Sequence, residues 1–544
     1  MSTERPGRDL GLPWTRLDTV AVVLVTVLAL VPRTVNLLGL DPFVDEAAWT
    51  DWAFRQFELT SPRTWIIPLV TDGRPPLFVW LMVPFGLVVD NGMLAGRLAA
   101  AVAGAASAGA LYALGRELAS RTVGAVAAIL WALSPFAIFF VRIAADDALL
   151  TLLTILTTWA SVCLARRPSL TTGTLCGATL ALAVFAKTTG VLLAAAPLLA
   201  LVLLGRPLDW RTYVRPLGAA IAAGLVVSAP LLLGVLPLLQ QVAIHTAAPA
   251  SSPGLHGNLL WGNLEVSAGW LETFVGNSFL VWVGIGLVLA LLFRQRGLLF
   301  AALLGGGLIA VLLSVTTPLF ARYLLFLAFP AYLLAAYAIE RASQLVRWLP
   351  GRPGPSGDRL RRAAGVAVVV VGLALALGER AGLGVEIVRD PAQARIPGSE
   401  HMGYVENWYA VYGMGQIVDE IRARSLERPV TVLVPPASRE SRVLIPYAAL
   451  RMYLRRMPDV RVVESPALWR AQDLREIRRT ARDGPTYLVV NGSYTDGSGM
   501  PNDVPAYTRQ LERRLGQEVP EAREVLRIPR PISPNWLSLY RLDP

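Results

Sequence analysis

Residues 123–165 read VGAVAAILWALSPFAIFFVRIAADDALLTLLTILTTWASVCLA, and this stretch decides the fold. Two long apolar runs flank a short polar segment, VRIAADD, which carries Arg142, Asp146 and Asp147. A helix needs roughly 20 mostly apolar residues to cross the hydrocarbon core, because no water is available there to satisfy backbone polar groups. The pattern therefore predicts two membrane-spanning helices joined by a tight, charged turn.

Apolar runs of the same kind recur along most of the chain. Of the 544 residues, 54% are hydrophobic and only 16% are charged, whereas an ordinary soluble domain carries about 25% charged residues. We place eleven spans near residues 18–38, 94–115, 121–140, 146–165, 171–186, 189–205, 214–239, 278–293, 297–316, 319–340 and 363–378. The composition excludes an ordinary soluble protein and predicts a polytopic α-helical membrane protein with about eleven transmembrane helices plus interfacial helices.

Arginine placement predicts the orientation, because short cytoplasmic loops are enriched in Lys and Arg. One set of loops carries Arg5, Arg8, Arg16, Arg116, Arg121, Arg166, Arg167, Arg206, Arg211, Arg215, Arg294, Arg296, Arg341, Arg347, Arg352, Arg359, Arg361 and Arg362. The opposite loop 240–277 has no Lys or Arg, so we expect it to be external, like the first loop, 39–93. The N-terminus is then cytoplasmic. This placement explains much of the net charge of +11 without a nucleic-acid partner.

Two regions depart from the pattern of long spans. The run from Pro75 to Val89 is short and contains Pro84, so we expect an interfacial or re-entrant helix. After Glu379 charges become frequent, and Val430–Pro435, Val460–Glu464 and Thr486–Asn491 are typical of buried strands with amphipathic stretches between them. We therefore expect a transmembrane domain over 1–378 and an external soluble α/β domain over 379–544.

An acidic pair opens the first external loop, in DPFVDEAAWTDW, where Asp45 and Glu46 follow the first span. Neighbouring carboxylates repel, and desolvation near a membrane favours the protonated form, so at least one of the two is expected to have a raised pKa. Such a group suits a general base. The alternative is that the pair caps the next interfacial helix or solvates the loop.

Several cations fall at predicted outer helix ends, where positive residues are depleted. Arg74 lies in DGRPPL, Arg142 in the turn described above, Lys187 in AKTTG, and Arg322 in LFARYL; Lys187 is the only lysine of the chain. Each one alone is explained equally well by snorkelling or by an ion pair with a nearby acid. Together, beside Asp147, they indicate a site for an anionic lipid headgroup.

The order of these segments resembles a known family. VDEAAW, GRPPLFVWL, RLAAAVAG, SPFAIFFVRIAADDALL, FAKTTGVLL and ARYLLFLAFP follow one another as in the GT-C glycosyltransferases, closest to the protein O-mannosyltransferase and aminoarabinose transferase group. The resemblance extends from Trp14 to Tyr337. It implies an integral-membrane glycosyltransferase that moves a sugar from a polyprenyl-phosphate donor to an acceptor hydroxyl of a lipid, glycan or protein, with inversion.

The resemblance also implies roles for individual residues. Asp45 stands at the catalytic position, Glu46 assists it, and Asp147 matches a second external acid. Arg74 stands where the family usually has lysine, and Arg74, Lys187 and Arg322 would hold the donor phosphate, with Arg142 orienting the site or the acceptor. Some relatives have a metal-binding acid just before the usual lysine. The residue here is Gly73, so no metal ligand is assigned, and a divalent metal stays an open alternative.

The loop 240–277 contains Trp261 and Trp270, which we expect to be orienting or acceptor-binding residues on a lid, or equally a belt of interfacial tryptophans. A lipid-linked sugar flippase or transporter without transferase chemistry is the alternative function. It predicts midplane charges and matching broken helices in two halves, which this sequence lacks. Arg-rich, Lys-poor usage suggests a bacterial source, and hence a plasma (inner) membrane with the C-terminal domain external or periplasmic.

Overall fold

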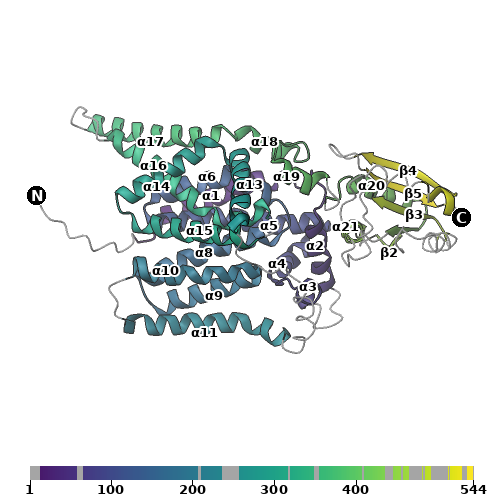
Figure 1. The fold of residues 1–544 in the computed structure, drawn as a ribbon, viewed down its shortest axis with the longest axis horizontal. Helices are drawn as coiled ribbons and strands as arrows, with labels where there is room; N and C mark the ends of the chain where they lie inside the picture. The colour runs from purple at the N-terminus through teal and green to yellow at the C-terminus, as the bar shows by residue number, and fades with distance from the viewer. Residues whose placement is uncertain are drawn as a thin grey trace, which may run out of the picture.

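The computed structural model describes residues 13–57, 65–205, 210–235, 257–316, 319–347, 355–406, 410–434, 445–454, 457–464, 481, 484–491, 513, 515–529 and 536–542. Figure 1 shows a large helical bundle with a β-sheet at one end of the molecule. Helices α2 and α21 lie between the bundle and the sheet.

Within the described ranges, six helices are long and apolar enough to cross a membrane, and the number rises to nine if each bent helix pair forms one span. The six are α1 (Arg16–Thr34), α5 (Gly92–Leu118), α8 (Asp146–Arg166), α11 (Trp210–Val235), α15 (Arg296–Val315) and α17 (Pro355–Gly378). The bent pairs are α6 (Arg121–Leu133) with α7 (Pro135–Val141), α13 (Gly257–Val275) with α14 (Asn277–Leu292), and η4 (Ala321–Leu327) with α16 (Phe329–Arg347). The predicted class of a multi-pass helical membrane protein is confirmed.

The two remaining predicted spans coincide with shorter apolar elements. These are α9 (Leu170–Ala186) and the pair η2 (Thr188–Ala194) and α10 (Ala195–Leu204). Small residues bring α9 close to α11, since a Cβ atom on Gly173 would collide with the carbonyl oxygen of Pro216, and one on Gly177 with that of Ala220. Backbones approach this closely only where side chains are absent. The position of α9 is therefore tightly determined.

The breaks within the bent pairs have chemical causes. Pro135 cannot donate a backbone hydrogen bond, so α6 ends before it and α7 begins at it, with a bend of 60°. Gly276 separates α13 from α14 with φ +80°, a conformation that favours glycine, and the bend there is 107°. Residues 257–275 of the expected loop 240–277 form the helix α13 and are not irregular; residues 240–256 lie outside the described ranges.

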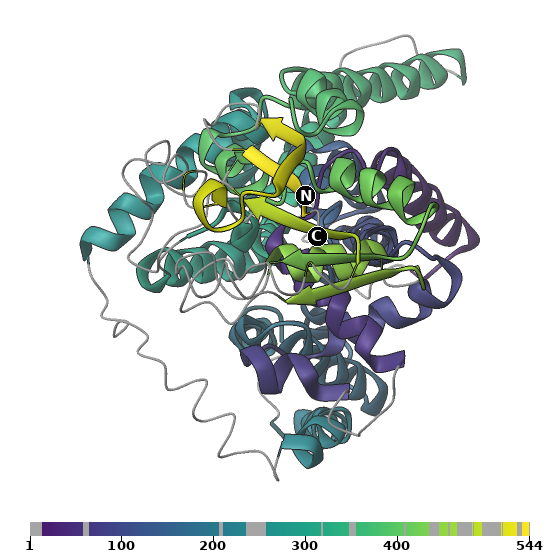
Figure 2. The same ribbon diagram turned by 90° about the vertical axis from the view of Figure 1, so that its right-hand side faces the viewer.

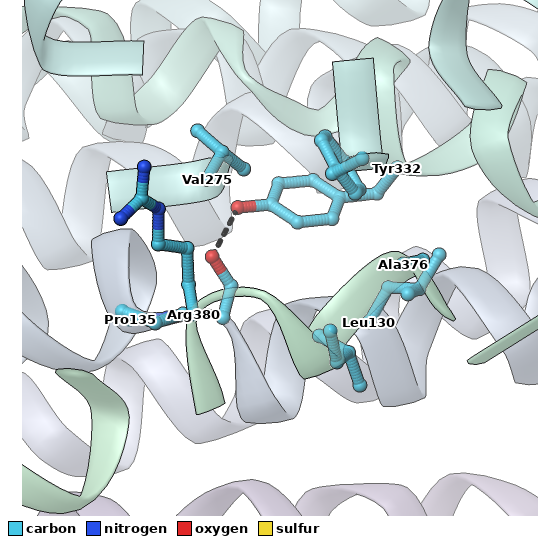
Figure 3. A pocket seen from close by; sticks show the side chains of 9 residues that line it. Leu130, Pro135, Val275, Tyr332, Ala376 and Arg380 are labelled. Carbon is cyan, nitrogen blue, oxygen red and sulfur yellow. Dashed lines mark hydrogen bonds between the residues drawn. The ribbon is translucent and has the colours of Figure 1, made fainter. Parts of the chain in front are cut away.

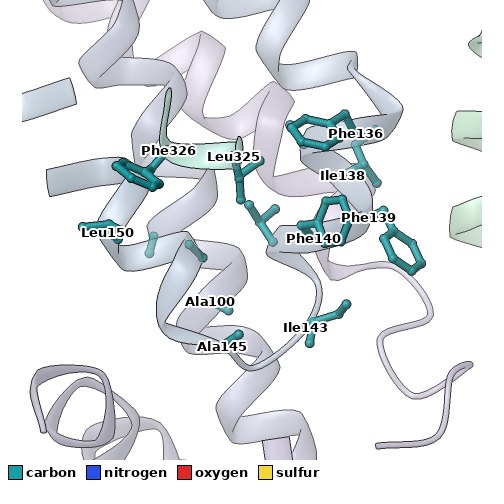
Figure 4. Close-up of a cluster of buried hydrophobic side chains, with 14 of the residues drawn as sticks. Ala100, Phe136, Ile138, Phe139, Phe140, Ile143, Ala145, Leu150, Leu325 and Phe326 are labelled. Carbon is teal, nitrogen blue, oxygen red and sulfur yellow. The ribbon is translucent and has the colours of Figure 1, made fainter. Parts of the chain in front are cut away.

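The first predicted loop, 39–93, contains three helices, α2 (Val44–Phe57), α3 (Ile67–Asp72) and α4 (Leu77–Val88). The apolar helix α4 coincides with the expected interfacial segment, and α2 packs against α4 and α5. Figure 4 shows Leu325 and Phe326 of η4 among buried side chains of α7 and α8, including Phe140 and Leu150. This apolar contact fixes η4 in the bundle.

The C-terminal sheet is mixed, with strand order β2-β1-β3-β5-β4. The strands are β1 (Val430–Val434), β2 (Val460–Glu464), β3 (Thr486–Asn491), β4 (Ala522–Pro529) and β5 (Trp536–Leu542). The first three coincide with the predicted strands and pair in parallel, whereas the sequence analysis missed β4 and β5, which pair antiparallel. Helix α21 (Ile445–Leu454) lies within the first of the two expected amphipathic stretches, 443–456, and the second, 467–481, lies almost wholly outside the described residues.

The segment between the last long helix and the sheet packs on the bundle. It contains α18 (Ala381–Arg389), α19 (Gly398–His401), the π-helix η5 (Met402–Glu406) and α20 (Met414–Ser425). Asp41 accepts hydrogen bonds from the backbone N–H groups of Gly413 and Gly415 at the start of α20, and Phe43 forms a β-bridge with Ala410. Figure 2 shows the sheet in front of the helices when the molecule is viewed from that end.

Candidate active site

Five elements bring charged side chains together. Asp45 lies in the first turn of α2, Arg74 follows the end of α3, Asp146 and Asp147 begin α8, Lys187 ends α9, and Arg322 lies in η4. Each residue sits at a helix end or in a short helix, where the backbone leaves the regular bundle. We call these six residues the ion cluster. Five of them are predicted site residues, and the sixth, Asp146, is the sequence neighbour of the predicted Asp147.

Asp45 is paired with two arginines. Its Oδ2 atom accepts a hydrogen bond from Nη2 of Arg322 at 2.8 Å, and its Oδ1 atom accepts one from Nη2 of Arg74 at 3.3 Å. Burial alone would raise the pKa of Asp45, but the charges of Arg322 and Arg74 outweigh it and hold this pKa below its ordinary value. The expected raised pKa is therefore wrong for Asp45, which is an anion at neutral pH.

The other half of the cluster centres on Lys187. Its Nζ atom donates to Oδ1 of Asp147 at 2.6 Å and to Oδ1 of Asp146 at 3.2 Å, and lies 4.8 Å from the ring centroid of Tyr323. The Nε atom of Arg322 lies 3.8 Å from Oδ2 of Asp147 and links the two halves. Three cations and three carboxylates thus form one continuous, nearly neutral group.

The guanidinium of Arg322 keeps unused donors. It is buried, and its Nε and Nη1 atoms have no hydrogen-bond partner among the described residues, nor does the Oδ2 atom of Asp147. The rings of Phe43, Phe320 and Tyr323 surround the guanidinium carbon at 5.0, 5.3 and 5.5 Å. Buried polar atoms are nearly always hydrogen-bonded in native proteins, so these donors point to an anionic ligand.

Glu46 turns away from the ion cluster. It is fully buried and forms a two-pronged pair with Arg97 of α5, at 2.8 and 2.7 Å, while also accepting from the backbone N–H groups of Phe43 and Ala144. These contacts join the start of α2 to α5 and to the turn before α8. Because Asp45 lies in the same turn of α2, these contacts of Glu46 also fix the position of Asp45. Arg97 was not singled out, although it begins the segment RLAAAVAG.

Arg142 is not part of the ion cluster. Its Nη1 atom donates to the carbonyl oxygens of Pro32 and Val35 at 2.7 Å each, and its Nη2 atom donates to that of Asn36 at 2.8 Å. Carbonyls at the end of a helix have no partner within the helix, so Arg142 caps the C-terminal end of α1. This placement gives Arg142 a structural contact in place of the expected orienting or acceptor contact.

The two tryptophans of α13 have different surroundings. Trp261 is 69% exposed, whereas Trp270 is buried and donates from Nε1 to Oγ of Ser399 at 2.8 Å. Trp270 thus holds the segment that follows α18, and the expected lid is a helix where the structure describes it. Its partner Ser399 precedes Glu400, a buried acid that the sequence reasoning missed.

Other features of the described residues offer no second site of this kind. Across the described parts of the chain, no three His, Cys, Asp or Glu side chains are grouped to hold a metal ion. Cys163 and Cys176 are buried and not bonded to each other. Figure 3 shows a small, mostly apolar pocket beside the hydrogen bond from Tyr332 to Ser134, lined also by Val275 and Arg380. It involves none of the ion cluster.

Comparison with known families gives one sequence match. Residues 73–233 match the family model described as dolichyl-phosphate-mannose-protein mannosyltransferase. The matched segment includes Arg74, Asp147 and Lys187 but neither Asp45 nor Arg322. No curated protein sequence matches the chain.

Solved structures share the fold over nearly the whole chain. ArnT from Cupriavidus metallidurans in the apo state has a TM-score of 0.59 and 18% identity, covering 96% of this chain and 98% of that one. The same protein bound to undecaprenyl phosphate has a TM-score of 0.59 and 16% identity with the same coverage. An Archaeoglobus fulgidus oligosaccharyltransferase tethered with an acceptor peptide reaches 0.50 at 11% identity, over 88% of this chain and 69% of that one. At these identities the similarity is one of fold.

Proposed function

We propose that the chain is a membrane glycosyltransferase of GT-C type that transfers a sugar from a polyprenyl-phosphate donor to an acceptor hydroxyl; residues 73–233 match the mannosyltransferase family model, and the chain shares the ArnT fold. The observation that carries the proposal is the buried guanidinium of Arg322, whose free Nε and Nη1 donors lie beside Asp45 and Asp147. The ArnT structure bound to undecaprenyl phosphate supports the class of donor.

Arg322, Arg74 and Lys187 bind the donor phosphate. A phosphate oxygen accepts a hydrogen bond from Nη1 of Arg322, which has no hydrogen-bond partner among the described residues. Arg74 shares its partner Asp45 with Arg322, and Lys187 shares its partner Asp147 with Arg322, so all three cations attract the phosphate. Asp147 keeps Lys187 in place for this contact.

Asp45 is the general base. The acceptor oxygen forms a bond to the anomeric carbon while the bond from that carbon to the phosphate oxygen breaks, and its electron pair leaves with the phosphate. The acceptor proton passes to the Asp45 carboxylate. Before the donor binds, Arg322 and Arg74 stabilise the Asp45 anion. A donor phosphate bound by these arginines offsets their positive charge beside Asp45. The Asp45 carboxylate then accepts a proton more readily, which is what the transfer step requires.

Direct displacement by the acceptor inverts the anomeric configuration. The reaction takes place on the external side of the plasma membrane, as the arginine-poor loops predict, and the acceptor is the hydroxyl of a lipid, glycan or protein. The matched segment 73–233 and the resemblance of the first-loop acids support this assignment.

Binding measurements test the phosphate assignment. We expect the purified protein in lipid nanodiscs to bind a short-chain polyprenyl-phosphate-mannose at least about tenfold more tightly than the same mannosyl lipid without phosphate, because charge-assisted contacts stabilise by roughly 1.5–3 kcal/mol each. Microscale thermophoresis of both ligands gives the comparison. Equal affinities for the two lipids would contradict a phosphate site.

A further inference from the structure

Glu400 lies against the turn that carries Arg322. It belongs to α19, in the segment between the last long helix and the β-sheet, and its side chain is only 2% exposed. Its Oε1 atom accepts a hydrogen bond from the backbone N–H of Ala321, at 3.3 Å, and its Oε2 atom has no hydrogen-bond partner among the described residues. Resting on the proposed function, we propose that Glu400 is a positioning residue that sets Arg322 for the donor phosphate.

The contact acts at the start of η4. Ala321 is the first residue of that helix, where a backbone N–H has no partner within the helix, and Arg322 is the next residue. An acidic side chain at such an end stabilises the turn. Glu400 itself is held by its neighbours, because Trp270 donates to Ser399 and Nε2 of His401 donates to the carbonyl oxygen of Ala392. The C-terminal segment therefore fixes where the guanidinium points.

The charge of Glu400 matters as well as its shape. Burial raises its pKa to about 7, although the contacts to Ala321 and Arg322 oppose the rise. Arg322 on η4 and Tyr404 on its own segment interact electrostatically with Glu400, and His401 is the next residue. Tyr404 and Arg322 in turn interact with Asp147 on α8 and Asp45 on α2. Burial also raises the pKa of Tyr404, which stays neutral.

An ionised Glu400 competes with phosphate. The ion cluster already balances three cations with three carboxylates, so a fourth carboxylate beside Arg322 weakens the attraction for an anion. Glu400 is neutral below about pH 7 and charged above it. Phosphate binds more tightly when Glu400 is neutral, so the affinity of the protein for the phosphate falls as the pH rises through about 7. The hydrogen bond to Ala321 survives in both forms.

The test uses a farnesyl methyl phosphodiester, whose single negative charge does not change near neutral pH, with farnesyl methyl ether as the neutral probe. For the wild-type protein in nanodiscs we expect about tenfold weaker phosphodiester binding at about pH 8.5 than at about pH 5.5. Glu400→Gln keeps an oxygen for Ala321 but has no charge, so its affinity should stay at the low-pH value throughout. Glu400→Ala should bind more weakly than Glu400→Gln at every pH.

Two matched variants separate this role from a general structural one. Glu379 also accepts from a backbone N–H at a helix start, that of Ser278 in α14, so Glu379→Gln should keep the wild-type pH profile. His401→Gln should keep it too. If Glu400→Ala binds the phosphodiester as tightly as Glu400→Gln, the positioning role is refuted, and if Glu400→Gln keeps the wild-type pH dependence, the charge effect of Glu400 is refuted; the phosphate site stands in both cases. If the wild-type protein does not prefer the phosphodiester over the ether, the proposed function itself fails.

Discussion

Replacing Asp45 by asparagine is expected to lower sugar transfer by at least about a hundredfold, because a positioned general base contributes roughly a hundredfold to ten-thousandfold. Asparagine keeps the shape, but its one amide oxygen replaces only one of the two carboxylate oxygens that accept from Arg322 and Arg74, and it takes up no proton. The donor phosphate no longer competes with a carboxylate for these arginines, so donor affinity should stay the same or increase. Single-turnover transfer rates and donor binding on the same preparation measure the two effects separately.

Glu46 provides the matched control for Asp45. It is the next residue and also a carboxylate, but it is buried against Arg97. Glu46→Gln leaves that guanidinium without its counter-charge, and breaking a buried pair costs about 3–5 kcal/mol of folding stability. We expect Glu46→Gln to have a lower thermal stability than the wild-type protein. The Glu46→Gln protein that remains folded should transfer sugar faster than Asp45→Asn does. Near-normal transfer by a correctly folded Asp45→Asn protein would remove Asp45 from the mechanism.

Replacing Lys187 by methionine is expected to weaken donor binding by tenfold or more, since a charge-assisted contact is worth roughly 1.5–3 kcal/mol. The methionine keeps an apolar stem but leaves Asp146 and Asp147 without the ammonium that lies 3.2 and 2.6 Å from them. Two uncompensated carboxylates then repel the phosphate. Lys187→Arg should retain part of the affinity, and Arg74→Lys, which restores the residue usual in the resembling family, should be tolerated.

The effect of Lys187→Met is measured as the affinity for two lipids, the polyprenyl-phosphate-mannose and the same mannosyl lipid without phosphate. The loss should appear with polyprenyl-phosphate-mannose and not with the phosphate-free mannosyl lipid. Arg422→Met serves as a matched cation control, because Arg422 is exposed on α20 beside Asp419, away from the ion cluster. An equal loss for both lipids with Lys187→Met would mean that Lys187 acts on folding or lipid packing instead of on phosphate.

Much of the fold follows from local sequence. Each predicted span coincides with a helix, with a pair of consecutive helices or, for 278–293, with one half of a bent pair, and β1, β2 and β3 begin at the predicted first residues because each strand is rich in valine and other apolar residues. The strands β4 and β5 were missed, since AREVLRIP mixes charges with apolar residues and only pairing across the sheet makes it a strand. Helix α13 was missed because its Gly, Asn and Ser residues are typical of loops.

The site was predictable only in part. Asp45 and Arg322 are 277 residues apart, and their common placement at predicted outer helix ends was enough to group them. The sequence carried no signal for which side of α2 each acid faces, so Glu46 was grouped with Asp45 although it binds Arg97. Arg142 was misassigned for a similar reason, since a cation at a helix end binds carbonyl oxygens as readily as a ligand. Glu400 comes from a segment outside any resemblance.

One reaction tests the central claim most directly. The purified protein is incubated with polyprenyl-phosphate-mannose that carries an isotopic label on the sugar, together with a membrane extract as the source of acceptor, and the products are resolved by mass spectrometry. We predict that labelled sugar appears on an acceptor and free polyprenyl phosphate appears in equal amount, and that neither forms with Asp45→Asn. Donor that is bound by the wild-type protein yet recovered intact, with no polyprenyl phosphate released, would contradict a transferase and favour a lipid carrier.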